Sequence, residues 1–209
     1  MVTAALILAA GTSSRMGRPK QLLDVGGRSM VATVVAEVAA SAVGDVVVVL
    51  GDRAAEVAVA VDPEQARVVI ASGYAEGMAA SLRAGLAALP AATERVLIVL
   101  GDQPMVTSAL LDVLLRLHER SGLPAAAVSV AGLPQPPAVV DRRMWAELEA
   151  LLGDTGLRSV LRAHPELLTT LPVGDEQLLD VDTPTDYARL RAAAATRAPA
   201  PATDTRLDA

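Results

Sequence analysis

The chain has 209 residues, a net charge of −6, no cysteine and three aromatic residues, Tyr74, Trp145 and Tyr187. This length is enough for one sizeable hydrophobic core. The acidic balance and the scarcity of aromatic side chains exclude a general nucleic-acid-binding surface. The lack of cysteine excludes disulfides and Cys-based metal centres, and it fits a cytoplasmic protein. The apolar run at 2–10 is too short to cross a bilayer, so we expect no membrane association.

Short apolar runs alternate with alanine- and leucine-rich segments of helical length along the first 130 residues. Strands are predicted at 4–8, 46–50, 68–70, 96–100 and 127–130, and helices at 30–42, 54–61, 79–89 and 108–120. Three of these strands are almost continuously apolar, which is typical of parallel strands that are covered on both faces. The alternation predicts an α/β fold with a mostly parallel sheet and helices on both sides.

The second half of the chain is less regular. Residues 131–137, AGLPQPP, are predicted to form a Pro-rich loop before a short strand at 139–140. Helices are predicted near 142–152 and 155–162, and a last helix begins at Pro184. We assign residues 1–194 to one domain and expect the Ala- and Pro-rich residues 195–209 to form a disordered tail.

Parallel α/β sheets bind ligands beyond the carboxyl ends of their strands, so functional residues are expected directly after each apolar run. The first such segment, residues 9–20, reads AAGTSSRMGRPK. Its glycine and hydroxyl residues can present donors to an anion. Four cations and a single acid, Asp24, fall between residues 15 and 28, which favours a polyphosphate ligand. The glycine spacing matches neither a Walker A loop nor a GxGxxG fingerprint.

Lys20, at the end of this segment, is the only lysine in a chain with 17 arginines. Lysine is a compact point charge on a slim stem, whereas arginine is a broad planar fork. A chain that favours arginine this strongly would be expected to use it wherever either cation suffices. We therefore predict that Lys20 acts at an anion site; a solvated loop with ordinary surface cations is the alternative.

Two predicted strands end in Leu-Gly-Asp, at Asp52 and at Asp102. Asp52 directly precedes a predicted helix and is interpreted as its N-cap. The helix after Asp102 has its own cap in Thr107, so Asp102 is free to face the crevice at the end of the sheet.

A second group of acids precedes the last predicted helix. Thr183 is a suitable N-cap, Pro184 fits the first helical position and Asp186 completes a capping box. Asp180 and Asp182 lie on the loop before this cap and face the same side of an extended chain. Surface acids at a helix start are the alternative reading of this pattern.

Several of these segments resemble one protein family. LILAAGTSSRMGRPK is similar to the signature loop of the MobA-like nucleotidyltransferases, and most of all to the MocA-type molybdenum cofactor cytidylyltransferases. The similarity continues at YAEGMAASLRAGLAAL, VLIVLGDQPMV, GDTGLRSVLRAH and LLDVDTPTDYARL, so it spans roughly residues 4–191. It implies a single-domain, three-layer Rossmann-like fold. It also implies an enzyme that transfers a nucleoside monophosphate from an NTP to a phosphorylated acceptor and releases pyrophosphate.

The resemblance also implies roles for the charged residues. Mg²⁺, with Mn²⁺ as a substitute, would bind Asp102 and Asp182, and Asp180 is a weaker candidate ligand. Lys20 would stabilise the charge that builds at the α-phosphate. Arg15, together with loop N–H groups, would hold the β- and γ-phosphates.

The nucleotide would be bound largely by backbone groups of two segments. These are Ala9, Ala10, Gly11, Thr12, Ser13 and Ser14 after the first strand, and Gly77 to Ser81 at a helix start. Cytidylyl-type relatives carry Leu-Ala-Ala-Gly in the first segment, whereas guanylyl-type relatives carry Leu-Ala-Gly-Gly. The methyl group of Ala10 narrows the space for a purine, which predicts CTP over GTP.

The acceptor side departs from the family pattern. The family has Gly-His-Pro or Gly-Asn-Pro before the late strand, whereas this chain has Gln-Pro-Pro-Ala at 135–138, so only Pro137 matches. Gln103, Pro137 and Arg158 are the candidate acceptor-binding residues. The resemblance implies molybdopterin or the molybdenum cofactor as acceptor, and a molybdoenzyme or its chaperone as a candidate partner. Another phosphorylated small molecule, or a non-catalytic nucleotide-binding or cofactor-delivery module, is the alternative.

Neither histidine is required as a general base, because a phosphomonoester acceptor is already largely dianionic at neutral pH. His118 lies near the end of a predicted helix, where a cation is mildly favourable. His164 precedes Pro165 at another helix end. Both are interpreted as structural.

Overall fold

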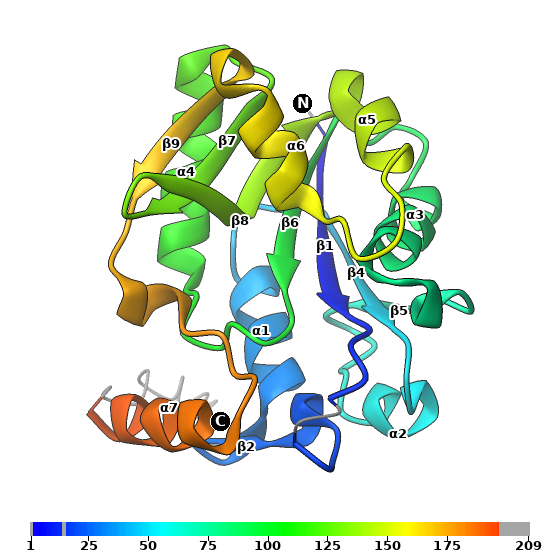
Figure 1. Cartoon of the computed structure of the whole chain (residues 1–209), viewed down its shortest axis with the longest axis vertical. Coiled ribbons are helices and arrows are strands. Elements are labelled where there is room, and N and C mark those ends of the chain that lie inside the picture. Colours follow the sequence, from blue (N-terminus) through cyan, green and yellow to red (C-terminus); the bar gives the residue numbers. More distant parts are fainter. Residues whose placement is uncertain (1, 14–15, 197–209) are drawn as a thin grey trace, which may run out of the picture.

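The computed structural model describes residues 2–13 and 16–196. Its main sheet has seven strands in the order β5-β4-β1-β6-β8-β7-β9 (Figure 1). They are β1 (Thr3–Ala9), β4 (Asp45–Leu50), β5 (Arg67–Ile70), β6 (Arg95–Leu100), β7 (Ala125–Val130), β8 (Leu133–Asp141) and β9 (Leu168–Pro172). Neighbouring strands are parallel except for the two pairs that involve β8. The predicted α/β fold with a mostly parallel sheet is confirmed.

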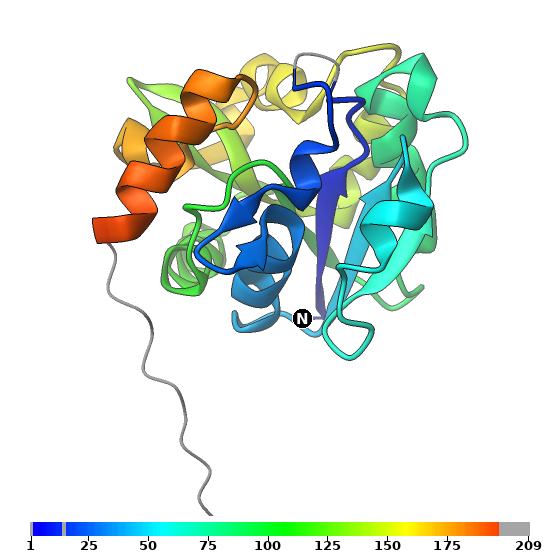
Figure 2. The ribbon, with the colours of Figure 1, turned by 90° about the horizontal axis from the view of Figure 1, so that it is seen from below.

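Helices cover both faces of this sheet and make three layers (Figures 1 and 2). One face carries α1 (Met30–Ala39), α2 (Ala54–Ala58) and α4 (Ser108–Ser121), and the other carries α3 (Met78–Ala88), α5 (Trp145–Glu149) and α6 (Leu157–Ala163). Burial on both faces of the sheet explains why β1 is apolar at almost every position. Its fully buried side chains alternate between the two cores, with Ala5 and Ile7 in one and Ala4 and Leu6 in the other.

A third, smaller core joins segments from the two ends of the chain. Its buried members are Leu23, Met30, Val181 and Leu190. It packs the hairpin of β2 (Asp24–Val25) and β3 (Arg28–Ser29) near the last helix, α7 (Pro184–Thr196). The hydroxyl group of Tyr187 also donates to the carbonyl oxygen of Asp24 at 2.9 Å. This core therefore ties α7 to the segment that follows the loop after β1.

The strand order reverses beside β1. The chain places β4 and β5 on one side of β1 and then returns to place β6 on the other side. A crevice forms at such a switch point, between the loops that leave the two central strands. The segments after β1 and β6, which hold Lys20 and Asp102, therefore border the same crevice.

The Pro-rich loop predicted at 131–137 is wrong. β8 already begins at Leu133 and pairs with β7, and the pairing register shifts between Ala127 and Val128. Proline lacks the N–H that a regular ladder needs, but an irregular stretch tolerates it. β9 and the β2–β3 hairpin are additional to the predicted strands. Residues 197–209, most of the predicted tail, lie outside the described residues.

Two smaller expectations also need correction. Asp52 does not cap α2, because the chain enters this helix through Arg53 in a left-handed conformation (φ 51°) with no side-chain cap. His118 lies near the end of α4 as predicted, but it is 3% exposed, and burial lowers its pKa. It is therefore neutral at pH 7 rather than a cation at the helix end. By contrast, Thr107 caps α4 as predicted by accepting from the Leu110 N–H at 3.2 Å.

No helix in the described part of the chain combines the length and the apolar character needed to cross a membrane.

Candidate active site

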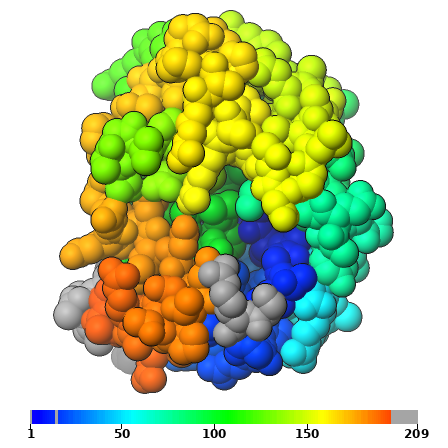
Figure 3. Space-filling model, viewed as in Figure 1, coloured from blue at the N-terminus to red at the C-terminus, as the bar shows by residue number. Residues whose placement is uncertain are grey.

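A cavity of about 760 Å³ opens at the carboxyl ends of β1 and β6. Its walls are the loop after β1, the start of α3, the segment from Asp154 into α6, and the carboxylates at the ends of β6 and before α7. Figure 3 shows this hollow between the α6 region, the loop after β1 and the segment before α7. The cavity lies at the switch point of the sheet and beyond the carboxyl ends of its strands, and a ligand site was predicted beyond those carboxyl ends.

A buried glutamine holds the loop after β1 in shape. Gln21 is 3% exposed, and its Nε2 donates to the carbonyl oxygens of Ala9 and Gly11 at 2.9 and 3.1 Å. Its Oε1 accepts from the hydroxyl of Ser13 at 3.2 Å. The Ser13 hydroxyl oxygen accepts in turn from the N–H of Lys20 at 3.0 Å. These bonds fold the loop back on itself and set Lys20 in the cavity wall. Ser14 and Arg15 lie outside the described residues.

The Lys20 ammonium lies between two carboxylates that come from distant parts of the chain. Its Nζ is 2.6 Å from Oδ2 of Asp102 and 2.8 Å from Oδ1 of Asp182. The lysine side chain is 13% exposed. Burial alone would lower the pKa of Lys20, but the two carboxylates outweigh it and raise the pKa above its ordinary value. Lys20 is therefore charged at neutral pH, and the three residues form one charged centre.

The carboxylate donors of this centre fit a divalent metal. Oδ1 of Asp102 is buried and has no hydrogen-bond partner among the described residues, so one hard oxygen donor remains available. Asp182 also lines the cavity. Within residues 2–13 and 16–196, no group of three or more acidic or histidine side chains could hold a metal by itself. A set of two carboxylates suits Mg²⁺ or Mn²⁺, because Mg²⁺ usually keeps several waters and takes few protein ligands.

The predicted capping box at α7 leaves Asp182 available to Lys20. Oδ2 of Asp186 accepts from the Thr183 N–H at 2.9 Å, and the Thr183 hydroxyl oxygen accepts from the Asp186 N–H at 3.2 Å. The Val181 N–H donates to the carbonyl oxygen of Asp102 at 3.2 Å, which joins this segment to the end of β6. Asp186 therefore serves the cap, while Asp182 contacts the lysine.

The three residues predicted at the acceptor side have different surroundings. Arg158 lines the cavity and lies 3.4 Å from Asp180. Gln103, by contrast, is fully buried and does not line the cavity; its Nε2 donates at 2.8 Å to Asp180, which does. Pro137 is buried as well, and its neighbour Pro136 lines the cavity instead. Burial raises the pKa of Asp180, and the nearby charge of Asp102 adds to this effect.

The described residues predicted to bind the nucleotide all line the cavity: Ala9, Ala10, Gly11, Thr12, Ser13, Gly77 and Ser81. Gly77 has a φ of +113°, and a Cβ built there would lie 2.3 Å from the carbonyl carbon of Gly153. Only glycine allows the two loops to approach this closely. The Gly153 carbonyl oxygen also accepts from the Ala79 N–H at 3.1 Å, which fixes the loop against the start of α3.

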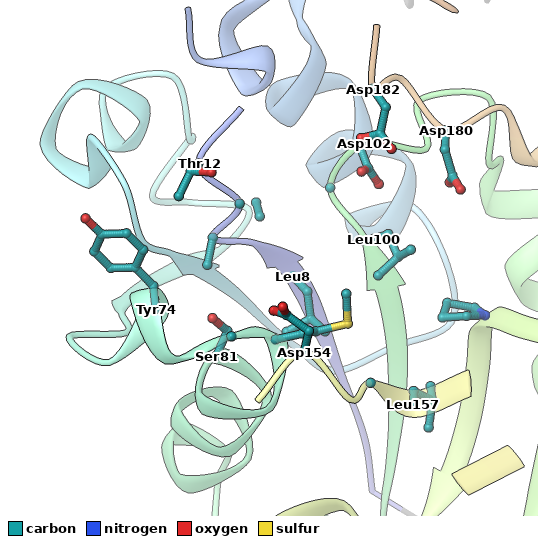
Figure 4. A pocket seen from close by; sticks show the side chains of 18 of the residues that line it. Leu8, Thr12, Tyr74, Ser81, Leu100, Asp102, Asp154, Leu157, Asp180 and Asp182 are labelled. Atoms are coloured by element: carbon teal, nitrogen blue, oxygen red, sulfur yellow. The ribbon is translucent and has the colours of Figure 1, made fainter. Parts of the chain in front are cut away.

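Several cavity residues were not among the predicted site residues, including Gln21, Tyr74, Asp154 and Arg162. Gln21 could have been noticed as a polar residue at the start of a short buried turn, and Arg162 as the residue four positions after Arg158 on one helix. Figure 4 shows Asp102, Asp180 and Asp182 gathered at one end of the cavity, with Thr12, Tyr74 and Ser81 at the other. The charged centre and the predicted base site are thus separate parts of one cavity.

A lysine and two carboxylates at the switch point of a mostly parallel sheet are suited to binding phosphate groups and a divalent metal. The chain belongs to the family of the MobA-like NTP transferase domain, whose model matches residues 5–167. The resemblance found in the motifs is confirmed.

Three relatives illustrate the range of this similarity. The chain is 33% identical over 193 residues to nicotine blue oxidoreductase of Paenarthrobacter nicotinovorans, covering 88% of this chain and 94% of that protein. The crystal structure of Rv0371c from Mycobacterium tuberculosis has a TM-score of 0.82 and 28% identity, covering 92% of this chain and 99% of that one. The structure of that protein in complex with manganese has a TM-score of 0.79 and 26% identity, and it covers the same percentages of the two chains. A nucleotidyl transferase from a Methanothermobacter species has a TM-score of 0.77 and 25% identity, covering 93% of this chain and 98% of that one.

Proposed function

We propose that the protein is a divalent-metal-dependent nucleotidyltransferase that moves a nucleoside monophosphate from an NTP, with CTP preferred, to a phosphorylated small molecule. The observation that carries this proposal is the Lys20 ammonium, held at 2.6 and 2.8 Å from Asp102 and Asp182 in the cavity wall. Transfer at phosphorus depends on positioning and charge neutralisation more than on covalent help. Family membership and the manganese complex of the mycobacterial relative support the metal requirement.

In the proposed reaction, a phosphate oxygen of the acceptor attacks the α-phosphorus of the NTP. A new oxygen–phosphorus bond forms, the bond to the β-phosphate oxygen breaks, and pyrophosphate leaves. Lys20 donates to oxygens that gain negative charge, and the N–H groups of the loop after β1 bind the outer phosphates, with Arg15 as a further ligand. Asp102 and Asp182 hold the divalent metal, which when bound neutralises phosphate charge. No general base is needed, since the acceptor phosphate is largely dianionic at neutral pH.

The preference for CTP rests on the segment Ala9-Ala10-Gly11. Ala10 is 9% exposed and lines the cavity, so its methyl group takes space that a glycine would leave to a larger base. The MocA-type resemblance supports the same choice of nucleotide. GTP is the alternative substrate.

The proposed acceptor is molybdopterin or the molybdenum cofactor, bound beside Arg158, and a molybdoenzyme or its chaperone would receive the product. The GDTGLR segment, which resembles the family pattern and ends at Arg158, supports this assignment. Another phosphorylated small molecule, such as a sugar phosphate, is the alternative acceptor.

A second candidate function comes from the relative that is matched over 94% of its length, nicotine blue oxidoreductase. A redox activity would require an electron donor and would not require Lys20 between two carboxylates. The charged centre therefore favours nucleotidyl transfer over reduction, and it also argues against a non-catalytic delivery module.

A turnover screen tests the proposal. Purified protein is incubated with CTP, GTP or ATP, with Mg²⁺ or Mn²⁺, and with molybdopterin or sugar phosphates, and pyrophosphate release is measured. A parallel assay follows oxidation of NADH and NADPH in the presence of oxidised heteroaromatic dyes. We expect metal-dependent pyrophosphate release with CTP and no dye reduction. A clear preference for GTP would refute the nucleotide assignment, and dye reduction without pyrophosphate release would refute the transferase assignment.

A further inference from the structure

Three carboxylates stand at the charged end of the cavity, but only two contact Lys20. The third, Asp180, directs both of its oxygens to other groups. Oδ1 accepts from Nε2 of Gln103 at 2.8 Å, and Oδ2 lies 3.4 Å from Nη2 of Arg158. Asp180 therefore differs from Asp102, which keeps one buried oxygen without a partner among the described residues.

Gln103 is a rigid support for this carboxylate. Its side chain is completely buried directly after Asp102, and its backbone N–H donates to the carbonyl oxygen of Leu100 at 3.3 Å. The neighbouring Val181 N–H donates to the carbonyl oxygen of Asp102 at 3.2 Å, so main chain and side chain join the two segments at the same place. A buried donor with a fixed backbone sets the orientation of the Asp180 carboxyl group.

Arg158 depends on this orientation. It is the second residue of α6, its side chain is 43% exposed, and Asp180 is its one ion-pair partner among the residues described. A long exposed side chain loses rotamer freedom when it binds a ligand, and a partner that restrains it beforehand lowers that cost. The contact to Asp180 uses one corner of the guanidinium group, so the remaining donors stay available to an anion in the cavity.

We infer that Asp180 is a positioning residue and not a metal ligand: Gln103 orients its carboxyl group, and the carboxyl group holds Arg158 toward the phosphate of the acceptor. This inference rests on the proposed function for its final step, while the arrangement of Gln103, Asp180 and Arg158 stands on the contacts alone. A role as third metal ligand makes the opposite prediction for metal binding, because loss of the Asp180 charge would then weaken it as loss of the Asp182 charge does.

Metal binding provides the first test, with free Mn²⁺ measured by electron paramagnetic resonance during titration of the full chain. Asp182→Asn and Asp102→Asn should each weaken Mn²⁺ binding by at least roughly tenfold, whereas Asp180→Asn should change it by less than about twofold. Asp175→Asn, an exposed acid outside the cavity, is the matched control. Weakening in Asp180→Asn equal to that in Asp182→Asn would overturn the inference.

The second test reads Arg158 directly and needs no substrate. The Nε–Hε resonance of Arg158 in ¹⁵N NMR spectra is identified by its loss in Arg158→Lys. We expect this resonance to shift and to exchange faster with water in both Asp180→Asn and Gln103→Met, and to stay unchanged in Asp175→Asn. Asp180 is 38% exposed on its side chain, so Asp180→Asn should fold even if Gln103→Met does not. An unchanged resonance in Asp180→Asn contradicts the inference.

Kinetics completes the test once an acceptor is found. Asp180→Asn and Arg158→Gln should each raise KM for the acceptor by about tenfold and leave KM for CTP unchanged, and the double variant should be no worse than Arg158→Gln. Fully additive effects would show that Asp180 does not act through Arg158. Failure to transfer to any acceptor would count against the proposed function, whereas the metal and NMR results would still decide the role of Asp180.

Discussion

Two clusters, each built around a largely buried cation, lie at opposite ends of the central strands of the sheet. At the carboxyl edge, Lys20 contacts Asp102 and Asp182 in the wall of a cavity. At the other edge, Arg95 at the start of β6 donates to the Thr3 hydroxyl and pairs with Glu119 at 2.5 Å. Next to it, Nε2 of His118 lies 3.1 Å from Asp141, at the end of β8.

The clusters resemble each other in burial and pairing, but they differ in access. Arg95, Glu119, His118 and Asp141 do not line the cavity, and their contacts join the ends of β1, β6 and β8. Lys20, Asp102 and Asp182, by contrast, all line the cavity. Pairing of a buried cation therefore does not distinguish the two clusters, whereas access from the cavity does. Substitutions in the Lys20 cluster should affect catalysis, and those in the Arg95 cluster should affect stability.

The largest effect is expected for Asp102→Asn. The amide keeps the shape of the side chain but removes a charge that the metal and Lys20 both use, so kcat for pyrophosphate release should fall by roughly 10³-fold. Asp52→Asn is a matched control, because Asp52 also ends a strand with Leu-Gly-Asp but does not line the cavity. Activity within about twofold of wild type in both variants would remove Asp102 from the mechanism.

Lys20→Arg should have the next largest effect. The ammonium is 2.6 and 2.8 Å from two carboxylates, the Lys20 side chain is 13% exposed, and a planar guanidinium cannot reproduce this compact arrangement. We expect kcat to fall by roughly 10²-fold while the thermal midpoint changes little. Arg18→Lys, an exposed exchange in the same loop, should leave kcat unchanged. Near-normal turnover in Lys20→Arg would show that the site needs only a positive charge.

Arg95→Gln should lower the stability of the protein and leave its turnover unchanged. Arg95 is 5% exposed, and its loss breaks contacts with Thr3 and Glu119, so the free energy of unfolding should fall by about 2 kcal/mol with kcat unchanged. Urea unfolding measures this change. Arg67→Gln removes an exposed pair with Asp45 and should cost less than about 1 kcal/mol. A drop in kcat for folded Arg95→Gln would contradict the separation of the two clusters.

The smallest effect is a pH dependence of stability that originates at His118. Burial lowers the pKa of His118; the charge of Asp141 opposes this shift, whereas Arg95 and Arg143 add to it. The unfolded chain binds a proton near the ordinary pKa of about 6.5 while the folded chain does not, so stability should fall as pH drops below that value. His118→Gln should flatten this slope in unfolding experiments between pH 8 and 5.5. The control variant His164→Gln should keep the slope. If His118→Gln also keeps it, the pH dependence does not originate at His118.

Sequence patterns predicted the parts of this molecule that depend on local chemistry. Continuous apolar runs indicated two-sided burial, and the Leu-Gly-Asp ending directed attention to Asp102. The capping box at Thr183 and Asp186 separated Asp186 from Asp182, and the structure has the same division. Lys20 was singled out by composition, because it is the one lysine of the chain. The predicted site roles themselves remain predictions.

Features that depend on distant partners could not be predicted in this way. Asp52 and Asp102 share the same local sequence, and the left-handed turn at Arg53 that distinguishes Asp52 is a property of the fold. Prolines in the segment 133–137 suggested a loop because the bulged pairing with β7 is not visible locally. Gln103 was predicted to bind the acceptor. It is buried by packing with the segment near Asp180, and this packing is not visible in the local sequence.

The third core, around Leu23 and Val181, has a consequence for how the protein is made. During synthesis the amino-terminal part of a domain emerges first. Lys20 and Asp102 are then available long before Asp182, and the partner helix α7 follows later still. The charged centre is therefore assembled only when nearly all of the described chain has left the ribosome, so that a partly synthesised chain cannot carry out the proposed reaction.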